Sequence, residues 1–492
     1  MAERNLLTDP IWRAAELGQA LPDSLHAVSV ALPRWQDVVG YEEKWPEVVS
    51  RLQCGYPRFV IHRLVQELAQ FIAADRPCLP FPSQHTAQQC VVFIHRQSGA
   101  VAEVVERAGH FGVATTAGAG YDSLKAFWQH TGQIVSTRRA EAAITGRSAH
   151  TPDDRAVRDA LRRQLAELYD CSPADVFLQP TGMAAMFAAL RAVMRRTPGK
   201  PTVQIGFPYV DTLKLQEKFG HGATLLHDLN HCAADLRELL EQGQLAGCFS
   251  EIPGNPLLGS ADLREITPLL RQYGVPLVAD DVVATPLNVD LTPHADLIAT
   301  SLTKYFVGSG DAMGGALICN PRSPYYAELQ AIAAALHEEL LWVEDAAVLE
   351  AQIGSFPERM RLHNSNGLAI AERLRRHPAI ADVWYPKWSF GDAYEAVRRP
   401  DGGWGSLVTF LPKNAVTASP QIYDKLEVCK GPSLGTSFTL ACPFTLLAHY
   451  TELDWAQACG VPRNLIRISV GLEDVEDLWG RIERALNEWR RY

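Results

Sequence analysis

Residues 295–315 read ADLIATSLTKYFVGSGDAMGG and hold the most informative pattern in the chain. The apolar run up to Thr300 predicts a buried strand, which ends at Ser301-Leu302-Thr303-Lys304 and continues into a glycine-rich loop. Lys304 is therefore a candidate reactive amine. A lysine attacks a carbonyl carbon only when it is unprotonated, and burial can lower its pKa enough to permit this. The alternative is an ordinary surface lysine in a loop.

The composition is that of a globular protein without an obvious polyanionic partner. Of 492 residues, 47% are hydrophobic and 21% are charged, and the formal net charge is -10. This acidic balance gives no overall attraction to nucleic acid or to anionic lipid. No apolar run approaches the length of a membrane span, and the N-terminus lacks the pattern of a signal peptide. We therefore expect a cytoplasmic protein with neither nucleic acid nor a membrane as partner.

The ten cysteines are scattered along the chain and form no CxxC pair. Neither a zinc module nor a redox dithiol is indicated, and we expect no metal site.

The length predicts two or three domains. The sequence pattern divides the chain into four segments. Residues 1–58 form an irregular arm whose tryptophans at 12, 35 and 45 suggest packing on another surface, which could be a second subunit. Residues 59–148 suggest a small α/β insertion without a chemical motif. Residues 149–320 suggest the large domain, and residues 321–492 a smaller C-terminal α/β domain that ends in a helix.

Within the insertion, residues 59–72 (FVIHRLVQELAQFI) predict a helix by apolar periodicity. Its expected apolar face consists of Val60, Leu64, Val65, Leu68 and Phe71. Residues 90–95 (CVVFIH) predict a buried strand, and residues 123–132 a short helix.

The large domain is expected to begin with a capped helix. Thr151-Pro152-Asp153-Asp154 matches a helix start. The expected buried stripe consists of Val157, Leu161, Leu165 and Leu168.

From 175 to 320, short β-branched runs alternate with helical patterns, which favours a mostly parallel sheet covered by helices. Ligands of such sheets gather at the carboxyl ends of the strands. The expected strands are 176–178, 202–207, 224–227, 247–252, 276–280, 296–301 and 315–319.

Thr181-Gly182-Met183 follows one of these strands directly and begins a helix. The backbone amides at a helix N-terminus can bind a phosphate group. Taken alone, this sequence is better explained by a plain N-cap, because most caps hold no ligand.

Asp280 closes another predicted strand and is followed by Asp281. A buried carboxylate at this place could keep the nitrogen of an aromatic heterocycle protonated. A turn-capping aspartate, or a metal-binding pair with Asp281, are the alternatives.

In combination these motifs resemble the Cys/Met-metabolism family of enzymes that depend on pyridoxal 5'-phosphate (PLP), and within it the fungal type of cystathionine γ-synthase. The resemblance rests on the helix-opening TGM, the strand-end Asp280 and the S-x-T-K before a glycine-rich turn, and it spans nearly the whole chain. It implies fold type I of the PLP-dependent transferases, an α/β fold with a mostly parallel seven-stranded sheet and a smaller C-terminal α/β domain.

The resemblance assigns the groups that bind the cofactor. Lys304 corresponds to the Schiff-base lysine, and Ser301 and Thr303 to phosphate contacts. The amides of Gly182 and Met183 are further phosphate contacts. Residues 280–286 (DDVVATP) stand where the family has D-N-T-x-A-T-P, which makes Asp280 the partner of the pyridinium nitrogen.

Other motifs correspond to groups around the ring and the substrate. Tyr209 in GFPYVDT stands where the family has a ring-stacking tyrosine, although a core tyrosine beside a strand end is an alternative. Asn255, in a loop of the E-x-P-x-N-P type, would bond the phenolic oxygen of the cofactor. Arg467 in RISVGLE would bind the substrate α-carboxylate as a planar fork, against the alternative of a surface ion pair. Ser433 of the S-L-G would help to hold the same carboxylate.

Tyr56 and Arg58 in CGYPRF match the family's Y-x-R, which reaches the cofactor phosphate of the neighbouring subunit. The N-P-T that normally follows is absent, and the insertion intervenes. The match implies a homodimer as the minimal active unit, and a homotetramer is usual in the family.

The activity implied by the resemblance is γ-substitution on an O-acylated homoserine, with Lys304, Tyr209 and Asp280 as the catalytic set. With cysteine as nucleophile, the product is cystathionine. Replacement by sulfide or by a carbon nucleophile stays open, as do γ-lyase elimination and the identity of the acyl group. Pro432 stands where many bacterial synthases and γ-lyases have glutamate. A non-catalytic regulatory homologue is the alternative from a different class.

Overall fold

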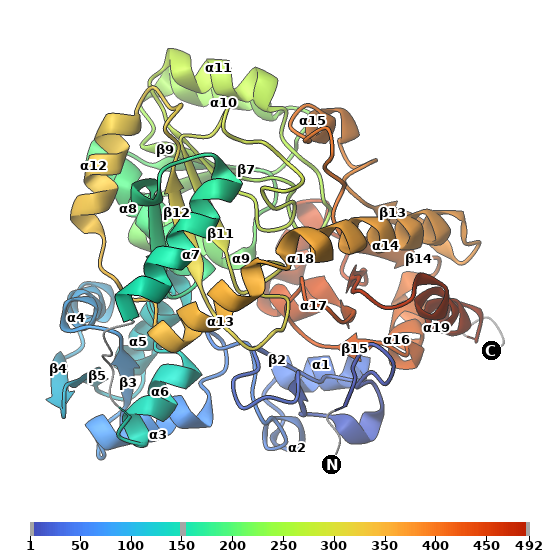
Figure 1. Cartoon of the computed structure of the whole chain (residues 1–492), viewed down its shortest axis with the longest axis horizontal. Coiled ribbons are helices and arrows are strands. Elements are labelled where there is room, and N and C mark those ends of the chain that lie inside the picture. The colour runs from blue at the N-terminus through green and yellow to red at the C-terminus, as the bar shows by residue number, and fades with distance from the viewer. Residues whose placement is uncertain (1–3, 148–153, 489–492) are drawn as a thin grey trace.

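Three sheets organise the computed structural model, which describes residues 4–147 and 154–488 (Figure 1). The largest has seven strands, the second five and the third three, and a two-stranded ribbon lies near the N-terminus. Within the described ranges, no helix is long and apolar enough to cross a membrane.

The seven-stranded sheet has the order β6-β12-β11-β10-β9-β7-β8. Only β12 runs against its neighbours, antiparallel to both β11 and β6. The predicted strands of this region are all confirmed, with bounds that differ by at most two residues. They are β6 (Val176–Gln179), β7 (Thr202–Ile205), β8 (Ala223–Leu226), β9 (Gly247–Glu251), β10 (Leu277–Asp280), β11 (Leu297–Ser301) and β12 (Gly315–Cys319).

Helices cover both faces of this sheet, as a parallel sheet requires. Successive strand residues point to opposite faces, so Phe177 packs into the cluster that contains α8, whereas Leu178 packs into the cluster that contains α7 and α11. The helices of this region are α7 (Asp154–Tyr169), α8 (Gly182–Arg196), α9 (Val210–Phe219), α10 (Cys232–Gln242), α11 (Leu263–Gln272), α12 (Tyr326–Leu336) and α13 (Val343–Ile353).

Helix α7 confirms part of the predicted stripe. Leu161 and Leu165 are fully buried, whereas Val157 and Leu168 are only partly buried. The predicted cap at Thr151-Pro152-Asp153 lies outside the described residues.

The insertion is a three-stranded antiparallel sheet of order β3-β5-β4 with four helices. Figure 1 shows it below the large sheet, in the blue and teal part of the chain. Its elements are α3 (Arg63–Ile72), β3 (Cys78–Phe81), α4 (Gln84–Ser98), β4 (Ala102–Arg107), β5 (His110–Thr115), α5 (Ala119–Thr131) and α6 (Thr137–Ile144). The helix predicted over 123–132 is confirmed as the second part of α5.

The buried strand predicted at 90–95 is wrong, because these residues lie inside α4. Cys90 and Ile94 are buried, whereas Val92 is 67% exposed. Positions four apart share one face of a helix, and the Ser83 side chain caps the helix by accepting from the Thr86 amide at 3.1 Å. A short apolar run cannot distinguish the two structures by periodicity alone.

The helix predicted over 59–72 is confirmed from Arg63 onward. Leu64, Val65 and Leu68 are buried as expected. Val60 precedes the helix, and Phe71 is 40% exposed. The guanidinium carbon of Arg107 lies 4.5 Å from the centroid of the Phe71 ring, which explains how an aromatic residue is tolerated there.

The C-terminal part contains the five-stranded sheet of order β13-β14-β17-β16-β15. Its strands are β13 (Ile380–Trp384), β14 (Leu407–Pro412), β15 (Cys429–Lys430), β16 (Leu440–Cys442) and β17 (Ile466–Ser469). Its helices are α14 (Phe356–Arg376), α15 (Gly391–Glu395), α16 (Ala415–Lys425), α17 (Phe444–Ala448), α18 (Leu453–Ala458) and α19 (Val475–Glu488).

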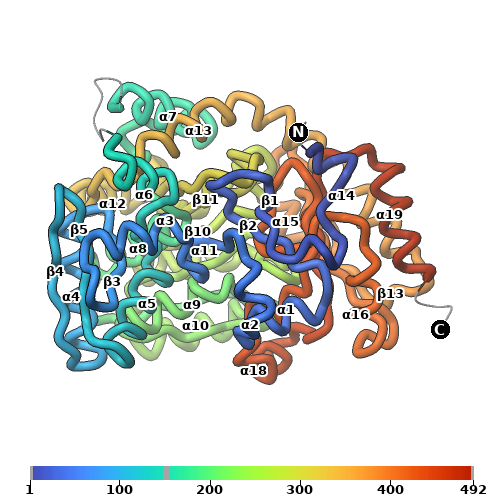
Figure 2. The backbone as a smooth tube through the Cα atoms, turned by 90° about the horizontal axis from the view of Figure 1, so that it is seen from below, coloured from blue at the N-terminus to red at the C-terminus, as the bar shows by residue number. Residues whose placement is uncertain are grey.

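The N-terminal arm packs on the C-terminal sheet of its own chain. Figure 2 shows the blue arm next to the orange and red C-terminal part. Val30 and Tyr41 share a buried cluster with Phe410. The Trp35 and Tyr423 rings meet edge to face, with centroids 6.1 Å apart. The elements of the arm are β1 (Ala20–Leu21), β2 (Ser29–Val30), α1 (Trp35–Glu42) and α2 (Pro46–Val49). The surface that the tryptophans suggested is thus provided within the chain.

These sheets and clusters support a division that we propose as the domain organisation, namely 1–58, 59–148, 149–320 and 321–492. Each of the last three segments contains one of the sheets, and the first is the arm.

The insertion core yields a stability prediction. Phe81 is 2% exposed, and its ring centroid lies 5.8 Å from those of both Phe127 and Trp128. We expect Phe81→Ala to lower the free energy of unfolding by about 3–5 kcal/mol, because it leaves a cavity. Val92→Ala, on the exposed face of α4, should change it by less than about 0.5 kcal/mol. Chemical denaturation measures both, and a Val92→Ala loss as large as that of Phe81→Ala would contradict the helical assignment of residues 90–95.

Candidate active site

The carboxyl ends of five parallel strands meet at one edge of the large sheet, and the predicted site residues follow these ends. They line a cavity of about 640 Å³ that also receives residues from the arm and from the C-terminal sheet. The predicted residues that line it are Tyr56, Arg58, Gly182, Met183, Tyr209, Asn255, Asp280, Ser301, Lys304, Ser433 and Arg467.

Lys304 lies three residues after the end of β11 and lines this cavity. The Nζ atom donates to Ser433 Oγ at 3.0 Å and lies 4.4 Å from the centroid of the Tyr56 ring. Burial lowers the pKa of Lys304, the nearby Tyr56 raises it, and the charges of Arg467 and Arg58 lower it further. The net decrease favours the neutral amine, which is the nucleophilic form.

The buried carboxyl groups of Asp280 and Glu251 also line the cavity, and Asp281 follows Asp280 in the chain. Burial, opposed by the Val282 amide and assisted by Asp281, raises the pKa of Asp280 to about 7. Burial, assisted by the charge of Asp280, raises the pKa of Glu251 well above its usual range. Burial also raises the pKa of Asp281 to about 6, and the Tyr169 hydroxyl donates to this carboxylate at 2.9 Å. A cationic N–H placed beside Asp280 would stabilise its charged form.

A metal ion is the other cation that such carboxylates suggest. In the described part of the chain, no group of three or more His, Cys, Asp or Glu side chains could hold one.

The N-terminus of α8 forms a further wall of the cavity. Thr181 caps the helix, since its Oγ1 accepts from the Ala184 amide at 3.1 Å. A Cβ atom on Gly182 would come within 2.6 Å of Ser301 Cβ. Only glycine therefore lets this helix end pack so closely against the end of β11. The arrangement directs backbone N–H groups toward an anion.

Arg467, on β17, closes the cavity from the C-terminal sheet. Its Nη1 donates to Asn255 Oδ1 at 3.2 Å and its Nη2 to the Ser433 carbonyl at 2.6 Å. The side chain is buried, and its Nε atom has no hydrogen-bond partner. Since a buried guanidinium normally pairs with a carboxylate, this one has the properties of a carboxylate-binding group.

Ser433 adopts a strained conformation between Lys304 and Arg467. Its φ of 95° lies in the region that favours glycine. The same residue accepts from Lys304 through its hydroxyl and from Arg467 through its carbonyl. Strain held in place by such contacts is common at functional sites.

Tyr56 and Arg58 lie in the cavity of their own chain, whereas the prediction placed them in the site of a neighbouring subunit. The Nη2 of Arg58 donates to the Tyr209 hydroxyl at 2.5 Å, and its Nη1 donates to the Gln129 carbonyl at 2.7 Å. The arm brings them there because it packs on the C-terminal sheet before it enters the insertion. Within this chain, the cavity acquires both groups without a second subunit.

One predicted contact is placed differently. Thr303 is buried, and its Oγ1 accepts from the Gly314 amide at 3.2 Å and lies 3.3 Å from the Gly314 carbonyl. The hydroxyl thus fixes the glycine-rich loop, and Thr303 is absent from the residues that line the cavity.

Three residues around Arg58 carried no recognisable motif in the sequence. Asp211, two positions after Tyr209, is fully buried and pairs with Arg58. Gln129 and His130, from the end of α5, line the same cavity. Their long sequence separation left no spacing by which they could be recognised.

The residues around the cavity fit PLP on observations of this structure alone. A buried amine with a lowered pKa suits its aldehyde, and the helix end at Gly182 suits its phosphate. Asp280, a buried carboxyl group whose pKa is raised, suits its protonated ring nitrogen. These three requirements meet in one cavity of sufficient size.

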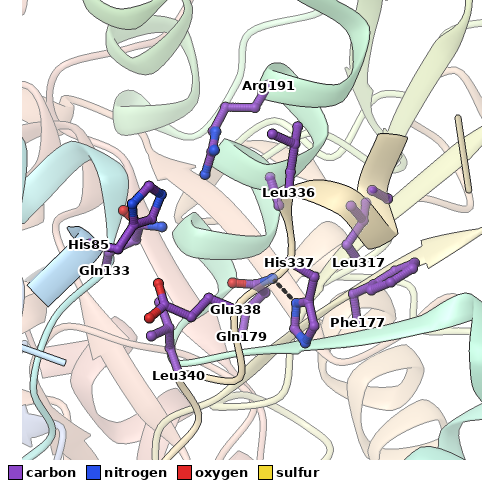
Figure 3. A pocket seen from close by; sticks show the side chains of 12 residues that line it. His85, Gln133, Phe177, Gln179, Arg191, Leu317, Leu336, His337, Glu338 and Leu340 are labelled. Atoms are coloured by element: carbon purple, nitrogen blue, oxygen red, sulfur yellow. Dashed lines mark hydrogen bonds between the residues drawn. The ribbon is translucent and has the colours of Figure 1, made fainter. Parts of the chain in front are cut away.

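A second cavity is too small for such chemistry. It lies between α8 and the end of α12, has a volume of about 20 Å³ and is lined by polar groups that include Gln179, Arg191 and His337 (Figure 3). The amide of Gln179 and His337 Nδ1 lie 3.4 Å apart. This volume holds about one water molecule.

Comparison with known proteins agrees with this geometry. A sequence profile described as "Cys/Met metabolism PLP-dependent enzyme" matches residues 129–487, and one described as "Fungal trans-sulfuration enzyme, N-terminal domain" matches residues 60–136. Tyr56 and Arg58 lie outside both matches, so neither match aligns them with a family motif.

Curated relatives match over nearly their full length. The chain is 34% identical to a cystathionine γ-synthase of Neurospora crassa, with 96% of this chain and 98% of the relative covered. It is 32% identical to the L-2-amino-4-chloropent-4-enoate dechlorinase/desaturase of Streptantibioticus cattleyicolor, with 93% and 95% covered.

Solved structures show the same fold. The cystathionine γ-synthase of Xanthomonas oryzae pv. oryzae, crystallised with cystathionine, superposes with a TM-score of 0.61 at 27% identity. The match covers 68% of this chain and 86% of that chain.

The titration of Asp280 yields a pH-dependent stability prediction for the cofactor-free protein. Burial is the main cause that raises its pKa from 3.8 to about 7. Between these values the folded chain keeps a proton that the unfolded chain has lost, so stability falls as the pH rises through this window. We expect Asp280→Asn, which cannot titrate, to remove about 3 kcal/mol of this decrease between about pH 4.5 and pH 7.

Urea unfolding at several pH values measures this difference. The exposed Asp401→Asn is the control for the substitution itself. Equal pH slopes in the wild type and Asp280→Asn would contradict the assignment.

Proposed function

The chain belongs to the Cys/Met metabolism family of PLP-dependent enzymes, and from this premise we propose that it catalyses γ-substitution on an O-acylated homoserine. The observation that carries the proposal is the meeting of Lys304, Asp280 and Arg467 around one cavity. Together they offer an amine, a partner for a ring nitrogen and a receptor for a carboxylate.

In this proposal the cofactor is held by groups from five strand ends and the arm. The amides of Gly182 and Met183, together with Ser301 and Arg58, bind the phosphate. Asp280 binds the ring nitrogen, Tyr209 stacks on the ring and Asn255 bonds the phenolic oxygen. Thr303 contributes by fixing the loop after Lys304, because its hydroxyl is already bonded to Gly314.

The substrate is oriented from the opposite side. Arg467 binds the α-carboxylate with its planar guanidinium. Ser433 holds both Arg467 and Lys304 and so sets the distance between the bound carboxylate and the amine. Tyr56, whose ring lies against Lys304, excludes water from the amine.

When bound, PLP acts as an electron sink that makes the Cα and Cβ protons of an amino acid removable. Lys304 is the group that moves these protons, since burial lowers its pKa and its Nζ atom faces the cavity. Lys304 would also return a proton to the substrate once the γ-acyloxy group has been replaced by the nucleophile at Cγ.

Cysteine is the nucleophile that we propose, with cystathionine as product. Support comes from the relatives named cystathionine γ-synthase, one of them 34% identical over nearly the whole chain. Lys125 and Lys218 line the cavity and have side chains suited to the carboxylate of a second amino acid. Sulfide, or a carbon nucleophile, is the alternative within the same reaction class.

Elimination without replacement is a second candidate function. The observation that favours it is the relative from S. cattleyicolor, which is named a dechlorinase/desaturase and is 32% identical to this chain.

A product assay by mass spectrometry tests these alternatives. The enzyme is offered O-acetyl- and O-succinylhomoserine with cysteine, with sulfide, with a β-keto acid and without nucleophile. We expect cystathionine as the main product, and its loss by at least about 1,000-fold in Lys304→Ala, which lacks the amine for proton transfer. A 2-oxobutyrate-only result would favour elimination, and PLP binding without any product would favour a non-catalytic homologue.

Assembly and location belong to the proposal as well. We expect a homodimer or a homotetramer in the cytoplasm, by resemblance to the family. Tyr56 and Arg58 line the cavity of their own chain. We therefore propose that these two residues serve the site of their own subunit.

Mixed oligomers test the origin of Arg58. We expect that a Lys304→Ala chain co-expressed with an Arg58→Ala chain shows no activity beyond that of the separate variants, because every site then lacks one of the two groups. Activity restored in the purified mixed oligomer would show that Arg58 serves a neighbouring subunit and would contradict the arrangement within one chain.

A further inference from the structure

We propose that Asp211 is a positioning residue that holds Arg58 at the phosphate end of the cofactor site, and that the 59–148 insertion is part of this site because Gln129 and His130 complete the binding of Asp211. The inference rests on the proposed function, since it assumes that the cavity binds PLP.

Asp211 lies in the first turn of α9, two positions after Tyr209, and no part of it is exposed. One oxygen of its carboxylate pairs with Arg58 Nη1. The other accepts from Gln129 Nε2 at 3.0 Å and lies 3.0 Å from His130 Nδ1. A buried carboxylate is tolerated only with such a set of partners. Asp211 therefore depends on Gln129 and His130 as well as on Arg58.

The charge of Asp211 is secured by these contacts. Burial alone would raise the pKa of its carboxyl group, but Arg58 and His130 outweigh burial and hold the pKa well below its usual range. The group is therefore a carboxylate over the whole working range of pH. Its pairing in turn keeps the guanidinium of Arg58 in one orientation.

That orientation leaves part of Arg58 available to a ligand. The guanidinium uses N–H groups for Asp211, for the Gln129 carbonyl and for the Tyr209 hydroxyl. A guanidinium has more N–H groups than these contacts require, and Arg58 lines the same cavity as Gly182 and Met183. The backbone amides of α8 and the guanidinium thus belong to one anion-binding end.

The insertion contacts this end at a second, independent point. The Gly132 carbonyl, directly after α5, accepts from Thr181 Oγ1 at 2.9 Å. Gly132 has a φ of +64°, and a Cβ atom at this position would lie 2.2 Å from Thr181 Oγ1. The end of α5 therefore holds Arg58 through Asp211 and holds the N-cap of α8 through Gly132.

The test measures the dissociation constants of PLP and of pyridoxal, which lacks the phosphate, with the cofactor-free full-length protein. We expect Asp211→Asn to weaken PLP binding about 10- to 100-fold, the range for loss of one charge-assisted hydrogen bond, and to leave pyridoxal binding unchanged. His130→Phe, which keeps a ring but no donor, should weaken PLP binding several-fold in the same selective way. This second variant serves if Asp211→Asn does not fold.

Asp345→Asn is the matched control. Asp345 is also a buried carboxylate paired with an arginine of the insertion, since Arg138 Nη1 lies 3.1 Å from its Oδ1, but neither residue lines the cavity. We expect it to lower the thermal stability of the cofactor-free protein without changing the PLP dissociation constant.

Three results would overturn the inference. If Asp211→Asn weakened the binding of PLP and of pyridoxal equally, Arg58 would not contact the phosphate. If Asp345→Asn weakened PLP binding as much as Asp211→Asn does, the Asp211 cluster would have only a structural role. A wild-type protein that binds neither compound would overturn the proposed function, and the inference with it.

Discussion

A buried charge needs a partner, and this constraint determines how the cavity is built. The parallel sheet brings the ends of β6, β7, β9, β10 and β11 to one edge, where Asp280 and Glu251 are buried close together. Arg467 lines the same cavity and has a buried nitrogen without a partner. A ligand with a cationic ring nitrogen and a carboxylate-bearing substrate would therefore satisfy groups that the protein leaves incompletely paired.

Arg58 differs, because the protein itself pairs it with a carboxylate, that of Asp211, and leaves only part of its N–H groups to a ligand. The difference follows from where the two arginines come from. Arg467 is on a strand of the C-terminal sheet and is fixed by its backbone, whereas Arg58 lies in a connecting segment between the arm and the insertion. A side chain on such a segment needs additional contacts to be held in one orientation, and Asp211, Gln129 and Tyr209 supply them.

The sequence was sufficient for the large sheet and for most of the cavity. Strands buried on both faces are continuous β-branched runs, so β6 to β12 could be recognised, and the residues after them are the site. Residues 90–95 were assigned wrongly, since a run of five apolar residues fits a strand and the buried face of a helix equally well. Gln129, His130 and Asp211 could not be found, because their partners lie far away in the sequence and no motif spacing connects them. Thr303 was recognised as part of the site, but only its hydrogen bond with Gly314 reveals that it fixes a loop.

The position of Arg467 on β17, the last strand of the chain, has a consequence for biosynthesis. The other walls of the cavity come from earlier parts of the chain, and domains fold in order as they leave the ribosome. Until β17 has emerged and paired with β14 and β16, the nascent protein has Lys304 but lacks the arginine that we propose as the receptor of the substrate carboxylate. The amine is thus synthesised before Arg467, and the cavity is complete only when the C-terminal sheet has formed.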